Sequence, residues 1–557
     1  MRSTLRTLLV LALTLSMALF VAACGGDDNG SGDSGDSGGE PASKIQEGGE
    51  ATFNYPSFPD YLDPAMSYTA AGWQALYASY GQLTTYARKE GKEGAVLIPG
   101  LAEALPEISE DGKTYTFKLR DGLKYSDGSE VKANDFEHAI KRVITLESGG
   151  ASFYTGTIKG AEDYLKAGKA KGDISGITAD DETGEIKIEL NAPNGQFPYI
   201  LSMPFASLVP GDTPFEVLTK NPPPGVAPMK LSSVEGSRRF VLEKNENWPE
   251  IEGIPAARLD KITVNVVDEN ERAIRDVLAN KADWMDDPGP GDALREFKET
   301  APDRYTDQVT NSTYYFFLNH RVKPFDNAEV RKAVGMAIDK KALERLFGGQ
   351  LEPGCNFLPP GMEGYEKIDP CPYGEGNDIE GAKAILEKEG VAGDEVTVWG
   401  NEEESTKAVT EYLADTLNKI GFKAKPRIVD GEVYFQTIGA QKTKAQIGFA
   451  NWFQDFPHPG NFLFLVDPDT IQETNNQNFS NVDDPEIKKQ LDELDTQELG
   501  EAAAGYAELD KKLVENADII PYGHRRLPSF YSERIAADQV LFHPVMLADY
   551  TSFALKQ

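Results

Sequence analysis

Helical and strand-like segments alternate between residues 326 and 428, and this alternation constrains the fold more than any other feature of the sequence. Asp326 to Phe347 predicts a helix in which Asp326 and Glu329 can form a capping box and which Gly348-Gly349 ends. Two further helices and two strands follow, at 378–389, 405–420, 396–399 and 422–428. A repeated strand–helix–strand order predicts an α/β domain in which helices cover a sheet.

The same periodicities predict elements along the rest of the chain. Apolar residues at helical spacing predict helices at 70–80, 132–143 and 271–280 and in the acidic stretch 483–510. Alternating or short apolar runs predict strands at 51–55, 115–119, 186–190, 259–267, 282–285, 314–318 and 447–450. At 557 residues, the chain is too long for one ordinary core and should form two or three domains.

The N-terminus has the organisation of an export signal. Arg2 and Arg6 flank an apolar run from Leu8 to Ala23, which is short for a membrane span, so an uncleaved signal anchor is the weaker alternative. The sequence Val21-Ala22-Ala23-Cys24 resembles the bacterial lipobox, in which the Cys is lipid-modified and becomes the first residue of the mature chain. Gly, Ser, Asp and Asn dominate residues 25–39, which predicts a flexible tether.

The net charge excludes two classes of partner. Asp and Glu number 90 against 56 Lys and Arg, which gives a formal charge of −34. Such a surface repels nucleic acid and anionic lipid, so neither is expected as a partner. A lipid at Cys24 would therefore be the link to the membrane.

Cysteines and histidines give no sign of a metal site or a cofactor. With Cys24 assigned to lipid, Cys355 and Cys371 form an even pair in an exported chain, and a disulfide is favoured over a metal site or a reactive thiol. The five His show no metal-ligand spacing. Gly-x-Ser-x-Gly occurs only at 35–39, within the predicted tether, and His-Glu-x-x-His does not occur, which disfavours a secreted hydrolase.

One stretch, 450–462, combines a carboxylate with large rings. Trp452, Phe453, Phe456 and Phe462 surround Asp455 in sequence, directly after the predicted strand at 447–450. Prolines at 457 and 459 prevent a helix or a central strand from continuing. An acid among aromatic side chains at a strand end could receive a ligand cation, but the alternative is a surface turn in which Asp455 bonds its own backbone.

An ordered set of short segments resembles one protein family. The segments are Leu62-Asp63-Pro64, Tyr80-Gly81-Gln82-Leu83, Pro99–Ala104, Phe117–Gly122 with Ser126–Gly128, Arg238–Trp248, Ala282-Asp283-Trp284, Pro324–Ala333 and Trp452–Pro459. Together they resemble the extracytoplasmic solute-binding proteins of ABC importers of the oligopeptide, dipeptide and nickel type. The likeness covers essentially the whole chain after the tether.

This resemblance implies an α/β, two-lobe periplasmic-binding-protein-like fold of class II, with an extra subdomain and a hinge. The expected divisions are a lipoprotein signal peptide at 1–23, a tether at 24–47, lobe one at 48–80, 206–307 and 521–557, the extra subdomain at 81–205, and lobe two at 308–520. Two crossing segments, near Asp307 and Ile520, would join the lobes.

The resemblance also implies a function without catalysis. The protein would be a lipid-anchored, extracytoplasmic monomer that encloses a peptide between its closing lobes and delivers it to an ABC permease and ATPase. A non-peptide solute such as an opine, a glycan or a metal chelate is the alternative within the family. A secreted hydrolase and a structural or adhesion lipoprotein are the alternatives outside it.

In peptide-binding members of this family the Asp of Trp-x-x-Asp pairs with the ligand's α-ammonium, a role that falls on Asp455. The backbone from Phe449 to Phe453 would pair with the extended peptide, which places Asn451, Trp452 and Phe453 at the site. Tyr68 and Thr69 are the expected facing wall.

Overall fold

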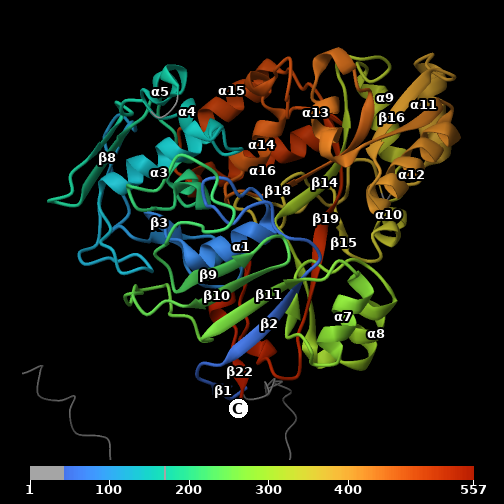
Figure 1. Ribbon diagram of the computed structural model, residues 1–557. Helices are drawn as coiled ribbons and strands as arrows, with labels where there is room; N and C mark the ends of the chain where they lie inside the picture. Colours follow the sequence, from blue (N-terminus) through green and yellow to red (C-terminus); the bar gives the residue numbers. More distant parts are fainter. Residues whose placement is uncertain (1–42, 169–170, 375) are drawn as a thin grey trace, which may run out of the picture. The chain divides into compact units, whose positions relative to one another are not determined.

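Three main β-sheets organise the chain in the computed structural model (Figure 1). The structure describes residues 43–168, 171–374 and 376–557. The predicted signal peptide, Cys24 and most of the predicted tether lie outside these residues. The last tether residues do not, because Ile45–Gln46 forms strand β1, which pairs with β22 (Leu555–Lys556). Within the described ranges, no helix is both long and apolar enough to cross a membrane.

The first sheet has five strands in the order β12-β2-β11-β10-β9. Its strands are β2 (Glu50–Tyr55), β9 (Met229–Glu235), β10 (Arg239–Lys244), β11 (Lys261–Val266) and β12 (Trp284–Met285). Strands β11 and β12 run parallel to β2 on either side of it. Helix α1 (Ala70–Ser79) contacts β9, while α7 (Asn270–Leu278) packs on α8 (Asp292–Thr300).

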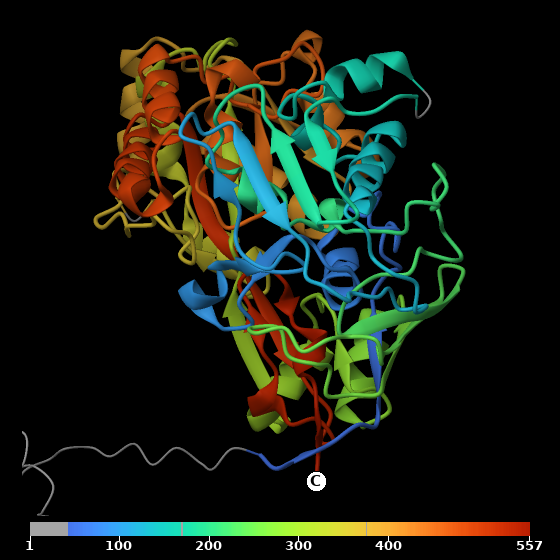
Figure 2. The same cartoon turned by 90° about the vertical axis from the view of Figure 1, so that its left-hand side faces the viewer.

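The second sheet lies within the predicted extra subdomain and faces the viewer in Figure 2. It is antiparallel, with the order β5-β6-β8-β7, and its strands are β5 (Glu107–Ile108), β6 (Thr114–Lys118), β7 (Ile177–Ala179) and β8 (Glu185–Glu189). Helix α3 (Asn134–Thr145) contacts β7 and buries Phe136, Ile140 and Val143. Shorter elements nearby are β3 (Thr84–Tyr86), β4 (Leu97–Pro99), α2 (Gly91–Gly94), α4 (Ser152–Thr155), α5 (Ala161–Ala167) and α6 (Phe197–Ile200).

The third sheet has seven strands and carries the predicted α/β alternation. Along β13-β19-β14-β18-β16-β17, with β15 also on β19, its strands are β13 (Tyr305–Val309), β14 (Ser312–Leu318), β15 (Leu351–Pro353), β16 (Glu395–Asn401), β17 (Lys423–Val429), β18 (Ile447–Phe453) and β19 (Ile519–Phe530). The associated helices are α9 (Ala328–Ala337), α10 (Lys340–Leu346), α11 (Ile379–Lys388), α12 (Glu404–Ile420), α13 (Tyr434–Ile438), α14 (Gly460–Leu463), α15 (Pro485–Leu494) and α16 (Leu499–Glu515). Two short strands, β20 (Phe542–His543) and β21 (Leu547–Ala548), pair near the C-terminus.

Strand β19 connects the third sheet with the first. Its beginning pairs with β14, and its end pairs with β13. Beyond that end, Tyr531 bridges to Trp284 of β12. The chain thus passes between the two sheets along two adjacent antiparallel strands, β13 and β19. Because contacts join all of residues 43–557 into one unit, the lobe boundaries stay a prediction.

The helix predicted at 326–347 is two helices, so this prediction was wrong. Ile338 is extended, and the Asp339 side chain accepts from the Ala342 N–H as the cap of α10. The predicted capping box is also wrong, because Asn327 caps α9 by accepting from the Glu329 N–H. Both errors involve Asn or Asp residues. In a stretch of helical periodicity, such a residue can be the cap that begins a helix rather than an interior position of one continuous helix.

Asp63, in the Leu62-Asp63-Pro64 segment, forms a buried ion pair with Arg142. Arg142 of α3 donates to both carboxylate oxygens of Asp63, at 3.0 and 2.8 Å, and both side chains are fully buried. The Leu218 N–H also donates to Asp63, at 3.0 Å. Asp63 therefore holds three distant segments together, which is a structural role.

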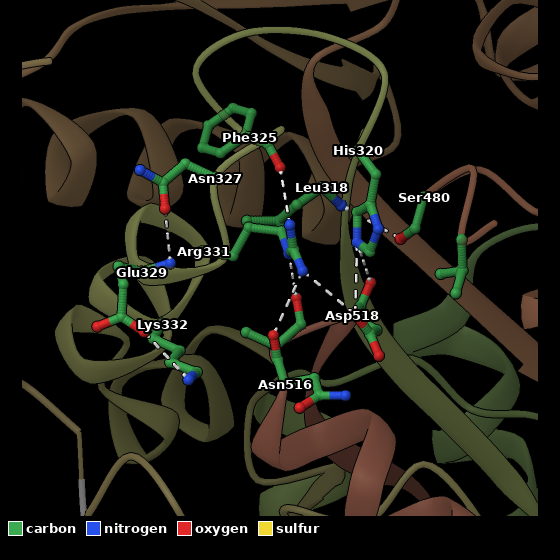
Figure 3. Close-up of polar contacts among 12 residues, drawn as sticks. Leu318, His320, Phe325, Asn327, Glu329, Arg331, Lys332, Ser480, Asn516 and Asp518 are labelled. Atoms are coloured by element: carbon green, nitrogen blue, oxygen red, sulfur yellow. Dashed lines mark hydrogen bonds and ion pairs between the residues drawn. The ribbon is translucent and has the colours of Figure 1, made fainter. Parts of the chain in front are cut away.

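A second buried cation, Arg331 of α9, fixes the start of β19 (Figure 3). Its guanidinium donates to the carbonyls of Phe325 and Ala517, at 3.1 and 2.9 Å, and to the Asp518 carboxylate, at 3.2 Å. Asp518 directly precedes β19, so the network joins α9, the loop before it and the residues that lead into the crossing strand. The nearby Lys332 is more exposed and pairs with Glu329 of its own helix.

Replacing Arg331 by Met should therefore destabilise the fold. Removing one partner of a buried pair leaves the other charge uncompensated, which typically costs about 3–5 kcal/mol. Urea unfolding of Arg331→Met should show this loss, whereas Lys332→Met should change stability by less than about 0.5 kcal/mol. Equal effects of the two substitutions would show that the Arg331 network does not anchor the fold.

Candidate functional site

A cavity of about 620 Å³ lies where the third sheet meets the first. Most of its walls come from the start of α1, the residues after β12, the end of β18, and the segment that contains β19 and residues 544–547. Thr310, Asn311, Phe435, Gln477 and Phe479 complete the lining. The walls are mainly apolar and aromatic with a few charged groups, which is the usual character of a small-molecule or peptide site.

The six residues expected at the site all line this cavity. Tyr68 stacks on Trp73 at 5.7 Å between ring centroids and is 36% exposed. Thr69 caps α1 by accepting from the Gly72 N–H, and its hydroxyl donates to Asp60 at 2.9 Å. Thr69 thus has a structural task at the cavity wall, whereas the ring of Tyr68 is open to it.

Three of the six, Asn451, Trp452 and Phe453, occupy the end of β18. The Asn451 side chain hydrogen bonds with the Tyr314 hydroxyl. The Trp452 indole N–H donates to Asn461 at 3.3 Å, and its ring packs edge-on against Phe464. Phe453 is 37% exposed, so a large apolar ring borders the cavity.

The end of β18 has an unpaired edge. One edge pairs with β14 along the whole strand, from Ile447 to Phe453. On the other edge, β16 pairs with Ile447 and Gly448, and the Tyr434 hydroxyl donates to the Phe449 carbonyl. For residues 450–453, the described chain provides no strand on that edge, so their backbone groups there are available to another extended chain.

Asp455 follows this edge and is buried without a cation. It is 5% exposed, and its carboxylate accepts from the Asn461 side-chain amide at 2.9 Å and from the Tyr68 hydroxyl. The Asp455 N–H donates to Asn461 rather than to the Asp455 side chain, so the alternative of a self-bonded surface turn was wrong. Among the described residues, no Lys, Arg or His forms an ion pair with it.

Burial raises the pKa of Asp455 to about 6, although the hydrogen bonds from Asn461 and Tyr68 oppose this increase. At neutral pH the carboxylate is therefore mostly ionised but poorly solvated. A ligand cation in the cavity would supply the missing counter-charge.

Several polar residues of the site were not predicted from the sequence. Asp286 and Asp287 follow β12, Gln74 lies in α1, and Arg525 lies in β19. Arg525 donates to Asp287 at 3.0 Å, whereas Asp286 accepts from Gln74 at 2.8 Å. The pair of acids after a short strand was a usable signal, because ligands in open α/β sheets bind beyond the carboxyl ends of strands. Gln74 gave no such signal, because the residues around it form a helical pattern that indicates core packing.

Neither the cysteines nor metal ligands contribute to the cavity. Cys355 and Cys371 form the expected disulfide, with Cα atoms 5.9 Å apart. In the part of the chain that the structure describes, no cluster of three or more His, Cys, Asp or Glu could hold a metal ion.

The raised pKa of Asp455 makes a prediction about stability. A carboxyl group whose pKa rises on folding contributes stability that is complete below its unfolded pKa, 3.8, and is lost as the pH rises through about 6. Asp455→Asn has no such group, so its stability relative to wild type should increase by up to about 3 kcal/mol from roughly pH 4 to pH 7. Urea unfolding of both proteins across this range provides the measurement. A difference that does not change with pH would show that the carboxylate is well solvated.

Comparison with known proteins identifies the family. Residues 96–473 match the family model described as bacterial extracellular solute-binding proteins, family 5, middle part. The oligopeptide-binding protein OppA of Bacillus subtilis (strain 168) is 26% identical over 514 residues, which cover 88% of each chain. Heme-binding protein A of Haemophilus influenzae is 27% identical over 447 residues, covering 76% of this chain and 77% of the relative.

A solved structure shows the fold. Clavulanic acid biosynthesis oligopeptide binding protein 2 superimposes with a TM-score of 0.82 at 23% identity, covering 93% of this chain and 97% of the other. This likeness confirms the expected α/β, two-lobe binding-protein fold. Since the family model matches well over half of the sequence, the chain belongs to the bacterial extracellular solute-binding proteins of family 5.

Proposed function

We propose that this protein captures peptides with a free amino terminus outside the cell and delivers them to an ABC permease driven by an ATPase. It acts as a monomer and without catalysis. The peptide lies in the cavity of about 620 Å³, with its α-ammonium on Asp455 and its backbone along residues 450–453 of β18.

The buried, unpaired carboxylate of Asp455 is the observation that carries this proposal. A carboxylate removed from water without a cation is unfavourable, and a ligand ammonium would relieve that cost. The free α-ammonium is common to peptides of different sequence, so one fixed carboxylate can orient many of them.

The unpaired edge of β18 supports an extended ligand. Backbone hydrogen bonds to such an edge add affinity without selecting side chains. The exposed rings of Tyr68, Phe435 and Phe453 would cover the ligand's side chains with apolar surface. A small rigid solute would leave the strand edge unused.

Both proposed lobes contribute to the cavity. Lobe one would contribute Tyr68, Asp286 and Arg525, and lobe two would contribute Trp452 and Asp455. The strands β13 and β19 would act as the hinge between them. A ligand held by both lobes favours the closed arrangement, which the permease can recognise.

Asp455→Asn should weaken the binding of a free peptide without affecting a peptide that lacks the ammonium. Loss of one partner of a desolvated charge pair costs about 2–5 kcal/mol, or more than tenfold in affinity. Calorimetry with trialanine and with N-acetyl-trialanine, on wild type and variant, measures the effect. The acetylated peptide should bind wild type weakly and lose little further affinity in the variant.

Asp510→Asn is the matched control for this experiment. Asp510 is also buried, and burial raises its pKa to about 6, but it bonds Asn356 and Phe357 away from the cavity lining. This variant should bind trialanine like wild type. If Asp455→Asn also binds trialanine like wild type, the ammonium site lies elsewhere or the ligand is not a peptide.

We also propose that lipid at Cys24 anchors the protein to the outer face of the cell membrane. The motif Val21-Ala22-Ala23-Cys24 after an apolar run supports this. Cys24→Ala should move the protein from the membrane fraction to the soluble extracytoplasmic fraction. A variant that remains with the membrane would require a different anchor.

A further inference from the structure

The cavity holds more negative charge than a zwitterionic peptide can balance. The charged residues that line it are Asp286, Asp287, Asp455 and Arg525. Arg525 pairs with Asp287 at 3.0 Å, which leaves Asp455 and Asp286 without a cation among the described residues. If the proposed function places the α-ammonium on Asp455, Asp286 still lacks a counter-charge.

Asp286 is as strongly desolvated as Asp455. It is 4% exposed, and burial, followed by the nearby charge of Asp287, raises its pKa to about 7. Its backbone is fixed, because its N–H donates to the Asn54 carbonyl at 2.9 Å at the end of parallel strands β2 and β12. The carboxylate is therefore held at the carboxyl end of these strands, where α/β folds bind ligands.

Gln74 provides an independent sign that a donor is missing at this place. Its side-chain nitrogen donates to Asp286 at 2.8 Å. Its side-chain oxygen is buried and has no hydrogen-bond partner, although Gln74 is only 3% exposed. Since a buried acceptor without a donor is costly, this oxygen and the Asp286 carboxylate together form an acceptor pair that lacks its donor.

We infer that Asp286 and Gln74 form a second cation subsite that binds the basic side chain of a peptide ligand. An ammonium has three donors and a guanidinium has five, so either can bond both the carboxylate and the amide oxygen. Asp287 already has Arg525 as its partner. A peptide with a free amino terminus and one Lys or Arg side chain supplies one cation for Asp455 and one for Asp286.

The two subsites lie along the same wall. Tyr68, which bonds Asp455, immediately precedes the cap of α1, and Gln74, which bonds Asp286, lies in the second turn of that helix. The subsites therefore lie at different points along the start of α1, and one extended peptide would place its α-ammonium at one and a side-chain cation at the other. Metal binding is a poorer explanation, because the described residues offer no metal-ligating cluster.

Peptide pairs that differ in one amino group test this inference, which rests on the proposed function. Each position of trialanine is replaced in turn by Lys or by norleucine, which keeps the carbon chain of Lys without its charge. Calorimetry on wild type should show at least one position at which the Lys peptide binds about tenfold or more tightly than its norleucine twin.

Asp286→Asn should reduce this ratio to about one while leaving the norleucine peptides bound as before. Asp287→Asn is the matched control, because its carboxylate is already paired with Arg525, and it should keep the preference. Gln74→Met should lower the ratio partially. Thermal unfolding verifies that each variant is folded, and the Gln74 variant decides the matter if Asp286→Asn does not fold.

The outcomes separate this inference from the proposed function. Equal binding of Lys and norleucine peptides at every position, or a preference that survives in Asp286→Asn, would refute the second subsite alone. Wild-type protein that binds none of the peptides would refute the proposed function and the subsite with it.

Discussion

The hydrogen-bonded ladder of β19 is the constraint on which the rest of the structure depends. This strand pairs with β14 at one end and with β13 at the other, and its final residues contact β12 of the five-stranded sheet. The Arg331–Asp518 pair fixes its beginning, and the Trp284 indole donates to Ser529 near its end, at 3.1 Å. Arg525, between these points, reaches the cavity and pairs with Asp287. The same strand therefore joins the two sheets and positions a charged group at the site.

The cavity combines a rigid frame with charges that the frame does not neutralise. The buried Asp63, for example, has a cation in contact. Asp455 and Asp286 instead receive neutral donors, from Asn461 and Tyr68 and from Gln74. Neutral donors hold a carboxylate in place but compensate its desolvation incompletely, so both acids are poised to gain from a ligand cation. The same two acids therefore lower the stability of the unliganded protein and provide affinity for the ligand.

Elements that depend on contacts between residues close in sequence were predicted well, whereas features that depend on distant contacts were not. Helix α11 and strands β16 and β17 follow directly from periodicity and caps, and the structure confirms them. The break at Ile338–Asp339 was missed, because apolar residues continue the helical spacing through it.

The site itself shows the same division between local and distant contacts. The stretch 450–462 was predictable as a site, since its rings, prolines and acid lie close together in sequence, although the strand continues to Phe453 rather than ending at Ala450. Asp286 was not, because its partner Gln74 is 212 residues away and occupies a helix whose pattern indicates core packing. Charge balance within a cavity depends on residues that the fold brings together, and periodicity does not report it.

Native mass spectrometry of the protein as purified from its own host tests the central claim, that a peptide occupies this cavity, most directly. The account predicts a set of bound masses that, after release and fragmentation, sequence as peptides with free amino termini. A single non-peptide solute bound at one-to-one stoichiometry would contradict it, and the strand edge and Asp455 would then need a different explanation.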